Sequence, residues 1–226
     1  MTDIYSPIRL PADDCLLYRE VRSLSDCRLL QRDLDRPVQS SKTWDMEFNV
    51  KKSNIIFITN ATSNNIRHQY TMYGESVCSA DTCVYLGVTM NSKLRWSEHI
   101  DKISGAAYRL LGFLWRSLNR CSQQLKEKSY KAVVRPKVEY CSCIWGPYHQ
   151  KYMDQLEMVQ RRAARFVKSV PHRRTKPPTS VSAMISDLGW EPLQTRRLHG
   201  RLNMFFRITR GMVELLWSTI QYHGTI

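Results

Sequence analysis

The pattern of hydrophobic and polar positions changes near residue 92. Before this point, short apolar runs are separated by turns of Asn, Ser and Gly, which is typical of strands in a mixed α/β segment. One helix is expected at 25–44, where three leucines recur at helical spacing. Pro37 should kink this helix or end it early. The expected strands are residues 6–10, 15–21, 54–59, 68–74 and 83–90.

From Ser97 onward the apolar spacing is helical, and three amphipathic helices are expected at 97–120, 151–168 and 192–211. The residues expected to face inward are Ile100, Ile103, Ala107, Leu110, Leu114 and Leu118 in the first helix, Tyr152, Leu156, Val159, Ala163 and Phe166 in the second, and Leu198, Leu202 and Phe205 in the third. Basic residues lie opposite the first two stripes: Lys102, Arg109, Arg116, Arg120, Arg161, Arg165 and Lys168. One basic helix face is ordinarily just solvated, but a series of them favours a surface that contacts phosphates.

The formal net charge of +14 lies almost entirely in the second half of the chain. Residues 1–92 contain 10 Lys and Arg against 11 Asp and Glu, whereas residues 93–226 contain 24 against 9. This asymmetry favours a polyanionic partner and indicates nucleic acid. The alternative is a solvated basic surface that serves only solubility.

Composition and targeting signals narrow the class of protein. A hydrophobic fraction of 42% and six tryptophans indicate a folded chain. No apolar run approaches the roughly 18 residues needed to span a bilayer, and the first residues lack the apolar segment of a signal peptide. Seven cysteines, an odd number, suit a reducing compartment. We therefore expect an intracellular protein, nuclear or cytoplasmic, that is neither secreted nor bound in a membrane.

Asp13 and Asp14 are adjacent carboxylates between two short apolar runs, at the expected tip of a hairpin. Asp disfavours strands and like charges repel, so the pair suggests a bound cation. Two magnesium ions held by carboxylates can clamp the attacking and leaving oxygens of a phosphoryl transfer. Because neighbouring strand residues point to opposite faces, a complete site needs a further carboxylate from another strand. The alternative is an ordinary acidic surface turn.

Two cysteine groupings loosely suggest zinc. They are Cys141-x-Cys143 with His149, and Cys78 with Cys83. Neither supplies the two closely spaced pairs that zinc sites usually have, so buried free cysteines are the favoured interpretation. Four tryptophans could stack on bases, although their apolar neighbours favour core packing: Trp96, Trp115, Trp145 and Trp190.

Several longer motifs occur in a characteristic order. RLPADDCLLYRE, MEFNVKKSNIIFIT and YLGVTMNSKLRWSEHI resemble the later palm motifs of reverse transcriptases from non-LTR (LINE-type) retrotransposons. AYRLLGFLWRSLNRCS, YKAVVRPKVEYCSCIWGPY, LEMVQRRAARFV and SVSAMISDLGWEPLQTRR are similar to the thumb and the following helical region of jockey- and CR1-like elements. The resemblance covers roughly residues 8–213, and the order and combination of the motifs make it specific.

The resemblance implies an α+β chain in three parts. Residues 1–92 would be the C-terminal part of a palm, with a small antiparallel sheet and a helix. Residues 93–170 would be an all-helical thumb, and residues 171–226 a basic, proline-containing connector with a C-terminal helical extension. The implied function is that of a fragment of an RNA-directed DNA polymerase, which uses an RNA template, a DNA primer, deoxynucleotides and two Mg²⁺ ions.

The resemblance also assigns roles to individual positions. Asp13 would be a catalytic metal ligand, and Asp14 the supporting carboxylate of the same pair. Lys52 would act near the triphosphate, although a solvated loop lysine is the alternative. The family's primer-grip strand corresponds to Tyr85, Leu86 and Gly87. The alternative for Leu86 is an ordinary core residue.

Two departures from the family pattern bear on activity. Pro11 stands where the family has an aromatic residue, which removes a backbone donor and a ring. No match to the family's fingers, its nucleotide-binding basic residues or its other catalytic aspartate precedes Asp13 in this sequence. We therefore expect the chain to be inactive alone. The alternatives are a non-catalytic basic module that binds RNA or an RNA–DNA hybrid, and an untranslated relic without a selected function.

Overall fold

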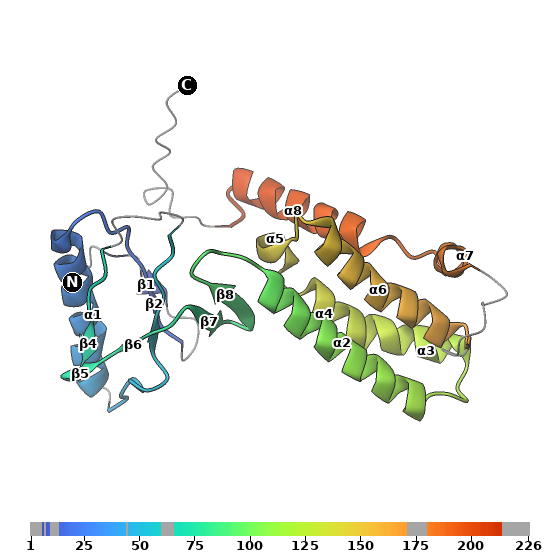
Figure 1. Cartoon of the computed structure of the whole chain (residues 1–226), viewed down its shortest axis with the longest axis horizontal. Helices are drawn as coiled ribbons and strands as arrows, with labels where there is room; N and C mark the ends of the chain where they lie inside the picture. The colour runs from blue at the N-terminus through green and yellow to red at the C-terminus, as the bar shows by residue number, and fades with distance from the viewer. Residues whose placement is uncertain are drawn as a thin grey trace, which may run out of the picture. The chain divides into compact units, whose positions relative to one another are not determined.

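The computed structural model describes residues 6, 8–9, 14–43, 45–59, 66–170 and 180–213 (Figure 1). These residues divide into two compact units. The first unit contains the described residues up to Tyr85 together with Met90–Leu94. The second contains Leu86–Thr89 and the described residues from Arg95 onward. Pro11 and Asp13 lie outside the described residues.

The first unit pairs its short strands two by two. The expected hairpin around the aspartate pair is confirmed, since Ile8 lies opposite Leu17 in an antiparallel register. The expected single antiparallel sheet is wrong for the described residues, which form separate two-stranded pairs, one of them parallel. These pairs are β1 (Ile8–Arg9) with β2 (Leu16–Leu17), β4 (Thr71–Met72) with β5 (Glu75–Ser76), and β3 (Asn54–Ile55) with β6 (Cys78–Ser79), the parallel pair.

Helix α1 (Leu24–Thr43) packs on β4 and completes the first unit. The side-chain amide of Gln31 pairs with the backbone of Thr71, donating to its carbonyl and accepting from its N–H, both at 2.9 Å. Val38 is buried against Met72. The expectation that Pro37 ends the helix early is wrong, because the helix continues to Thr43. Burial of the residues beyond the proline keeps the final turns packed against the strands.

The run 83–90 forms a hairpin rather than one strand, so that expectation is wrong. β7 (Thr82–Tyr85) pairs with β8 (Val88–Asn91), and Leu86 with Gly87 makes the turn. Both turn residues have positive φ angles, 46° and 79°. This is the backbone of a type I′ turn, whose twist matches that of the two strands it joins.

The second unit is built around α2 (Ser97–Ser117) and α6 (Gln150–Val167), which pack side by side (Figure 1). The rings of Trp115 and Phe166 lie 5.7 Å apart between them.

No helix in the described part of the chain is both long and apolar enough to cross a membrane. The remaining helical segments are α3 (Gln123–Ser129), the π-helical η1 (Tyr130–Val134), α4 (Arg135–Glu139), α5 (Ser142–Trp145), α7 (Val181–Asp187) and α8 (Leu193–Thr209).

The apolar stripes expected on the first two helices are largely confirmed. Trp145 and Trp190 are also buried, as the core interpretation of the tryptophans predicts. The buried members of the two stripes are Ile100, Ala107 and Leu114 in α2, and Leu156, Val159, Ala163 and Phe166 in α6.

A buried polar network ties the remaining segments to α6. The rings of Tyr130 and Trp190 stack with centroids 4.6 Å apart. The Tyr130 hydroxyl donates to Gln160 Oε1 at 3.3 Å, and Gln160 Nε2 donates to the carbonyl of Glu191 at 2.9 Å. Trp190 Nε1 donates to Glu127 Oε1 at 3.0 Å. The segment that leads into α8 is therefore fixed against both η1 and α6.

Helix α8 begins at Leu193, one residue later than expected, and its expected inward face is wrong. Leu198, Leu202 and Phe205 are 51%, 56% and 66% exposed. The helix is anchored instead by Leu193 and Arg197, which are both buried. These anchors lie in its first turns, so the apolar stripe farther along is left uncovered by the described residues.

The packing of α6 predicts a contrast between two residues on that helix. Leu156→Ala should lower the free energy of unfolding by about 2–5 kcal/mol, because Leu156 is fully buried and its removal leaves a cavity. Met158→Ala on the same helix should change it by less than about 0.5 kcal/mol, because Met158 is 41% exposed. Urea unfolding followed by the helical circular dichroism signal checks this. Equal losses in the two variants would contradict the packing of α6.

Candidate nucleic-acid interface

The turn that contains two expected primer-grip residues is fastened to the helical unit by Tyr140. The Tyr140 hydroxyl donates to the carbonyl oxygen of Leu86 at 3.1 Å. A Cβ added to Gly87 would lie 3.6 Å from the Tyr140 ring, so the glycine sits in van der Waals range of that ring. The Leu86 side chain is 44% exposed, which makes the core interpretation of this residue wrong.

His99, near the start of α2, holds the next residues of the hairpin. Its Nδ1 accepts the backbone N–H of Thr89 at 3.2 Å, and its ring packs edge-on against Trp145 at 5.1 Å. Trp145 in turn donates from Nε1 to the carbonyl of Tyr140 at 2.7 Å. Burial, with the nearby charge of Lys102, lowers the pKa of His99 below its ordinary value. Both the acceptor role of Nδ1 and the lowered pKa favour the neutral imidazole.

Sequence reasoning did not assign roles to Tyr140 or His99. Both occur inside the motifs that resemble the family, but hydrophobic periodicity carries no signal for a hydrogen bond to a distant turn. Lys102 was expected only as a phosphate contact. Its Nζ also lies 3.4 Å from Thr89 Oγ1, which places an exposed cation next to the hairpin.

The basic residues expected on α2 and α6 mostly face solvent. Arg161 in α6 is exposed, and its Nη1 lies 4.0 Å from the sulfur of Met158. Arg165 is half-buried and forms no ion pair with the described residues. The same holds for three exposed arginines: Arg109 and Arg116 in α2, and Arg120, which follows the end of α2 at Ser117.

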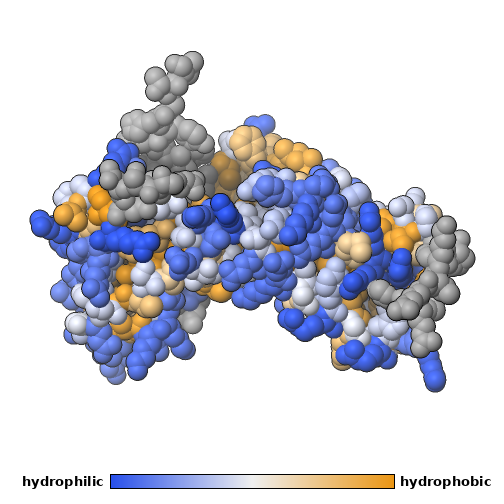
Figure 2. Space-filling view, in the orientation of Figure 1, coloured by the Kyte–Doolittle hydropathy of each residue, from blue (hydrophilic) through white to orange (hydrophobic). Residues whose placement is uncertain are grey.

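A cation–π contact also links α6 to α2. The guanidinium of Arg162 lies over the ring of Tyr108, 4.2 Å from its centroid. Arg109 and Arg161 are the sequence neighbours of this pair, and both are exposed. Hydrophilic side chains cover much of the second unit's visible face in Figure 2.

Among the basic residues expected to contact phosphates, Lys168 forms an ion pair with an acidic residue. Its ammonium group forms an ion pair with the carboxylate of Asp187 in α7, and its side chain is 22% exposed. An ion pair must be broken or shared before this lysine can contact a phosphate. Lys168 is therefore a weaker candidate than the arginines of α2 and α6.

The expected catalytic residues are not brought together in the described part of the chain. Asp14 is exposed, and Asp13 lies outside the described residues. Lys52 is exposed in a turn where its N–H donates to the carbonyl of Asn49 at 3.1 Å. Among the described residues, no group of three or more His, Cys, Asp or Glu could hold a metal ion. These residues do not supply the oxygen ligands of a two-magnesium site, so no catalytic step follows from them.

The cysteine groupings also lack a bound-metal geometry among the described residues. All seven cysteines are free thiols, and Cys78 is exposed. Cys83, Cys141 and Cys143 are partly buried. Burial raises the pKa of the Cys83 thiol, which favours its protonated form.

Three curated proteins of Drosophila melanogaster show what the chain is similar to. It is 25% identical over 171 residues to the RNA-directed DNA polymerase from mobile element jockey, which covers 73% of this chain and 18% of that protein. It is 26% identical over 165 residues to the probable RNA-directed DNA polymerase from transposon BS, and this match covers 71% of this chain and 18% of that protein. It is 25% identical over 162 residues to the probable RNA-directed DNA polymerase from transposon X-element, and this match covers 69% of this chain and 17% of that protein. No family model and no solved structure matches the chain.

The chain is therefore similar to the RNA-directed DNA polymerases of non-LTR retrotransposons, and the resemblance inferred from its motifs is confirmed. It spans about 18% of the length of the curated relatives that it matches first. This partial match is consistent with the expected fragment of such a polymerase.

The neutral state of His99 predicts how stability depends on pH. Because the pKa of His99 is lowered in the folded state, its contribution is fully present above the unfolded pKa of about 6.5. It is lost as the pH falls below this value, since the unfolded chain then binds a proton that the folded chain resists. The free energy of unfolding of the parent chain should therefore fall between pH 7 and 5 more steeply than that of His99→Asn.

Urea unfolding at several pH values measures this difference. His149→Asn is the matched control, because His149 is exposed and its loss should leave the pH dependence unchanged. Identical pH profiles for the parent chain and His99→Asn would contradict the prediction, because they would show that the folded chain does not favour the neutral form of His99.

Proposed function

We propose that this chain is the part of an RNA-directed DNA polymerase that holds the template–primer duplex. In this proposal the helical unit corresponds to the thumb and the first unit to the C-terminal part of the palm, with the boundaries near residues 92 and 170 that the motifs indicate. Polymerisation itself is assigned to a longer protein that includes this region. An intracellular location, consistent with seven free thiols, belongs to the same proposal.

The observation that carries the proposal is the arrangement of arginines on α2 and α6. The apolar side of each helix is buried in the unit, and the arginines project from the opposite side. Arg109, Arg116 and Arg165 have no acidic partner among the described residues, so binding a phosphate would not require breaking an ion pair. Guanidinium groups suit this task because they are always charged and can donate two parallel hydrogen bonds.

The same chemistry predicts binding with little sequence preference. Contacts to phosphates release counterions and carry no information about bases, so they supply affinity that depends strongly on salt. A duplex held during synthesis must move through its binding site after each addition. A surface that contacts only the backbone allows this movement without a new set of contacts for each sequence.

The assignments that come from the resemblance complete the proposal. The Leu86–Gly87 turn, preceded by Tyr85, would contact the primer end, and its attachment to Tyr140 supports a fixed position within the helical unit. Asp13 and Asp14 would be Mg²⁺ ligands in the longer protein. Lys52 would act near the triphosphate.

Salt dependence tests the proposal directly. If four or five phosphates of a short RNA–DNA hybrid are contacted, the logarithm of the association constant should fall with the logarithm of salt concentration at a slope of about −4. Changing Arg109, Arg116 and Arg161 together to Gln should flatten the slope by up to about 3, because each arginine lost removes about one phosphate contact. Fluorescence anisotropy with a labelled hybrid measures both slopes.

A matched variant separates a binding surface from overall charge. Arg28, Lys51 and Arg67 are exposed in the first unit, and changing them to Gln removes the same total charge. This control should alter the slope by much less than the helical variant. If both triple variants flatten the salt slope equally, at unchanged helix content, the positive charge serves only solubility. That result would remove the basis of the proposal.

A further inference from the structure

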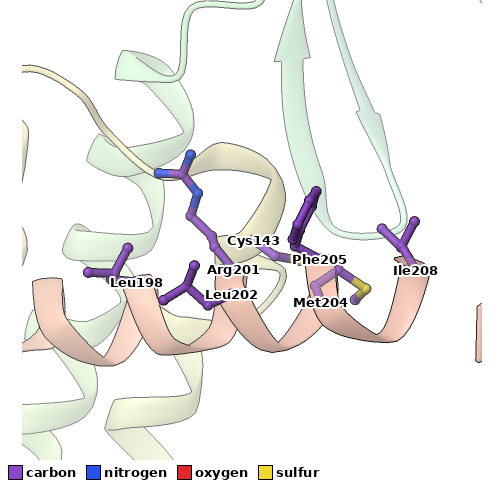
Figure 3. A pocket seen from close by; sticks show the side chains of 7 residues that line it. All are labelled: Cys143, Leu198, Arg201, Leu202, Met204, Phe205 and Ile208. Carbon is purple, nitrogen blue, oxygen red and sulfur yellow. The ribbon is translucent and has the colours of Figure 1, made fainter. Parts of the chain in front are cut away.

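Two adjoining cavities lie along α8, on the stripe that the described residues leave uncovered. The larger, of about 430 Å³, is lined mainly by apolar side chains of α8, with Cys143 of α5 on its other side (Figure 3). The smaller, of about 240 Å³, lies between the start of α8 and the segment that contains Gly146 and Pro147. Leu198 and Arg201 line both cavities, so the two form one groove along the helix.

Arg197, which lines the smaller cavity, has a buried guanidinium that lacks a partner among the described residues. Arg197 is only 4% exposed, and neither Nη1 nor Nη2 has a hydrogen-bond partner among the described residues. Burial lowers the pKa of Arg197, but a guanidinium still keeps its charge at neutral pH. A buried, unpaired charge is strongly unfavourable, so an anion that is not part of the described structure would stabilise this site.

The acidic residues nearest to Arg197 are occupied elsewhere. Glu139 is bound by Arg196, whose Nη2 donates to Oε2 at 3.1 Å. Glu157 Oε1 accepts the backbone N–H of Gln194 at 2.8 Å. Both carboxylates lie close enough to favour the charged form of Arg197, yet neither forms an ion pair with it. Helix α8 itself contains no Asp or Glu.

The surroundings of the guanidinium indicate what kind of anion fits. Met153, Pro147 and Leu198 line the cavity with apolar surface. The uncovered stripe continues through Leu202 and Phe205, at the spacing of one helix face, and hydrophobic residues gather along α8 in Figure 2. A nucleic-acid backbone, which is charged at every step, gains nothing from such a stripe. A helix with an apolar face and one acidic side chain matches both features.

We propose that the groove along α8 is a docking site for an amphipathic polypeptide helix, which inserts a Glu or Asp carboxylate beside Arg197 and covers Leu198, Leu202 and Phe205. The carboxylate supplies the missing hydrogen-bond acceptors, and a bidentate pair with the guanidinium fixes the register of the incoming helix. The apolar stripe supplies the buried area. This site uses a helix that the proposed nucleic-acid surface does not use.

A displayed library of amphipathic helical peptides tests the site on the full chain. Each peptide carries a fixed stripe of Leu and Phe, and the positions that flank the stripe are randomised. Selected peptides should be enriched in Glu or Asp at one position. Replacing that acid by Gln or Asn should weaken binding at least tenfold, measured by fluorescence anisotropy, because the buried guanidinium is again left unpaired.

Three variants decide the outcome. In Arg197→Met the acidic peptide and its amide counterpart should bind equally, and the unbound variant should unfold at a higher urea concentration, because a buried unpaired charge has been removed. Leu202→Glu, a change at an exposed position, should abolish binding without altering the fold. Arg207→Met, at an exposed position outside both cavities, should change neither property.

Several results would overturn the proposal. They are selection without enrichment of acids, an acid preference that persists in Arg197→Met, a less stable or unfolded Arg197→Met, and binding that survives Leu202→Glu. Stoichiometric competition by a short RNA–DNA hybrid that is lost in Arg197→Met would assign the groove to nucleic acid instead. None of these results depends on whether α2 and α6 bind a duplex.

Discussion

Burial of one apolar face on α2 against one on α6 is the constraint on which the helical unit depends. Ile100, Ala107 and Leu114 on the first helix, with Leu156 and Val159 on the second, are removed from water. A helix that buries one side must expose the other, so the arginines half a turn away project into solvent. The basic surface is thus a direct consequence of how the core is packed.

Contacts around Trp145 give the Leu86–Thr89 turn a fixed place within the helical unit. Trp145 is fully buried, and it contacts both the imidazole that holds Thr89 and the backbone of the tyrosine that holds Leu86. A turn with two positive φ angles has a well-defined shape but few contacts of its own. Its position relative to α2 therefore depends on Tyr140 and His99, and a change in either should be felt at the turn.

The sequence predicts a helix face correctly where that face packs against a neighbouring helix. It does not predict contacts between residues far apart in sequence, or show that an apolar face has no partner. The inward residues of α2 and α6 follow from helical spacing, because each stripe is covered by a neighbour. Spacing alone cannot show whether a partner exists, which is why Phe205 was expected inward and is 66% exposed. Lys168 looked free because its partner, Asp187, is 19 residues away in sequence. Leu86 and Gly87 were assigned to a strand, since turn chemistry inside an apolar run gives a weak signal.

Chemical footprinting of arginines tests the central claim, that the outward faces of α2 and α6 hold a nucleic-acid duplex. Phenylglyoxal modification of the full chain, read by mass spectrometry with and without a bound RNA–DNA hybrid, reports each arginine separately. The account predicts protection of Arg109, Arg116, Arg161 and Arg165, and unchanged reactivity at Arg28 and Arg210. Protection confined to α8 or to the first unit, with the arginines of α2 and α6 still reactive, would contradict it.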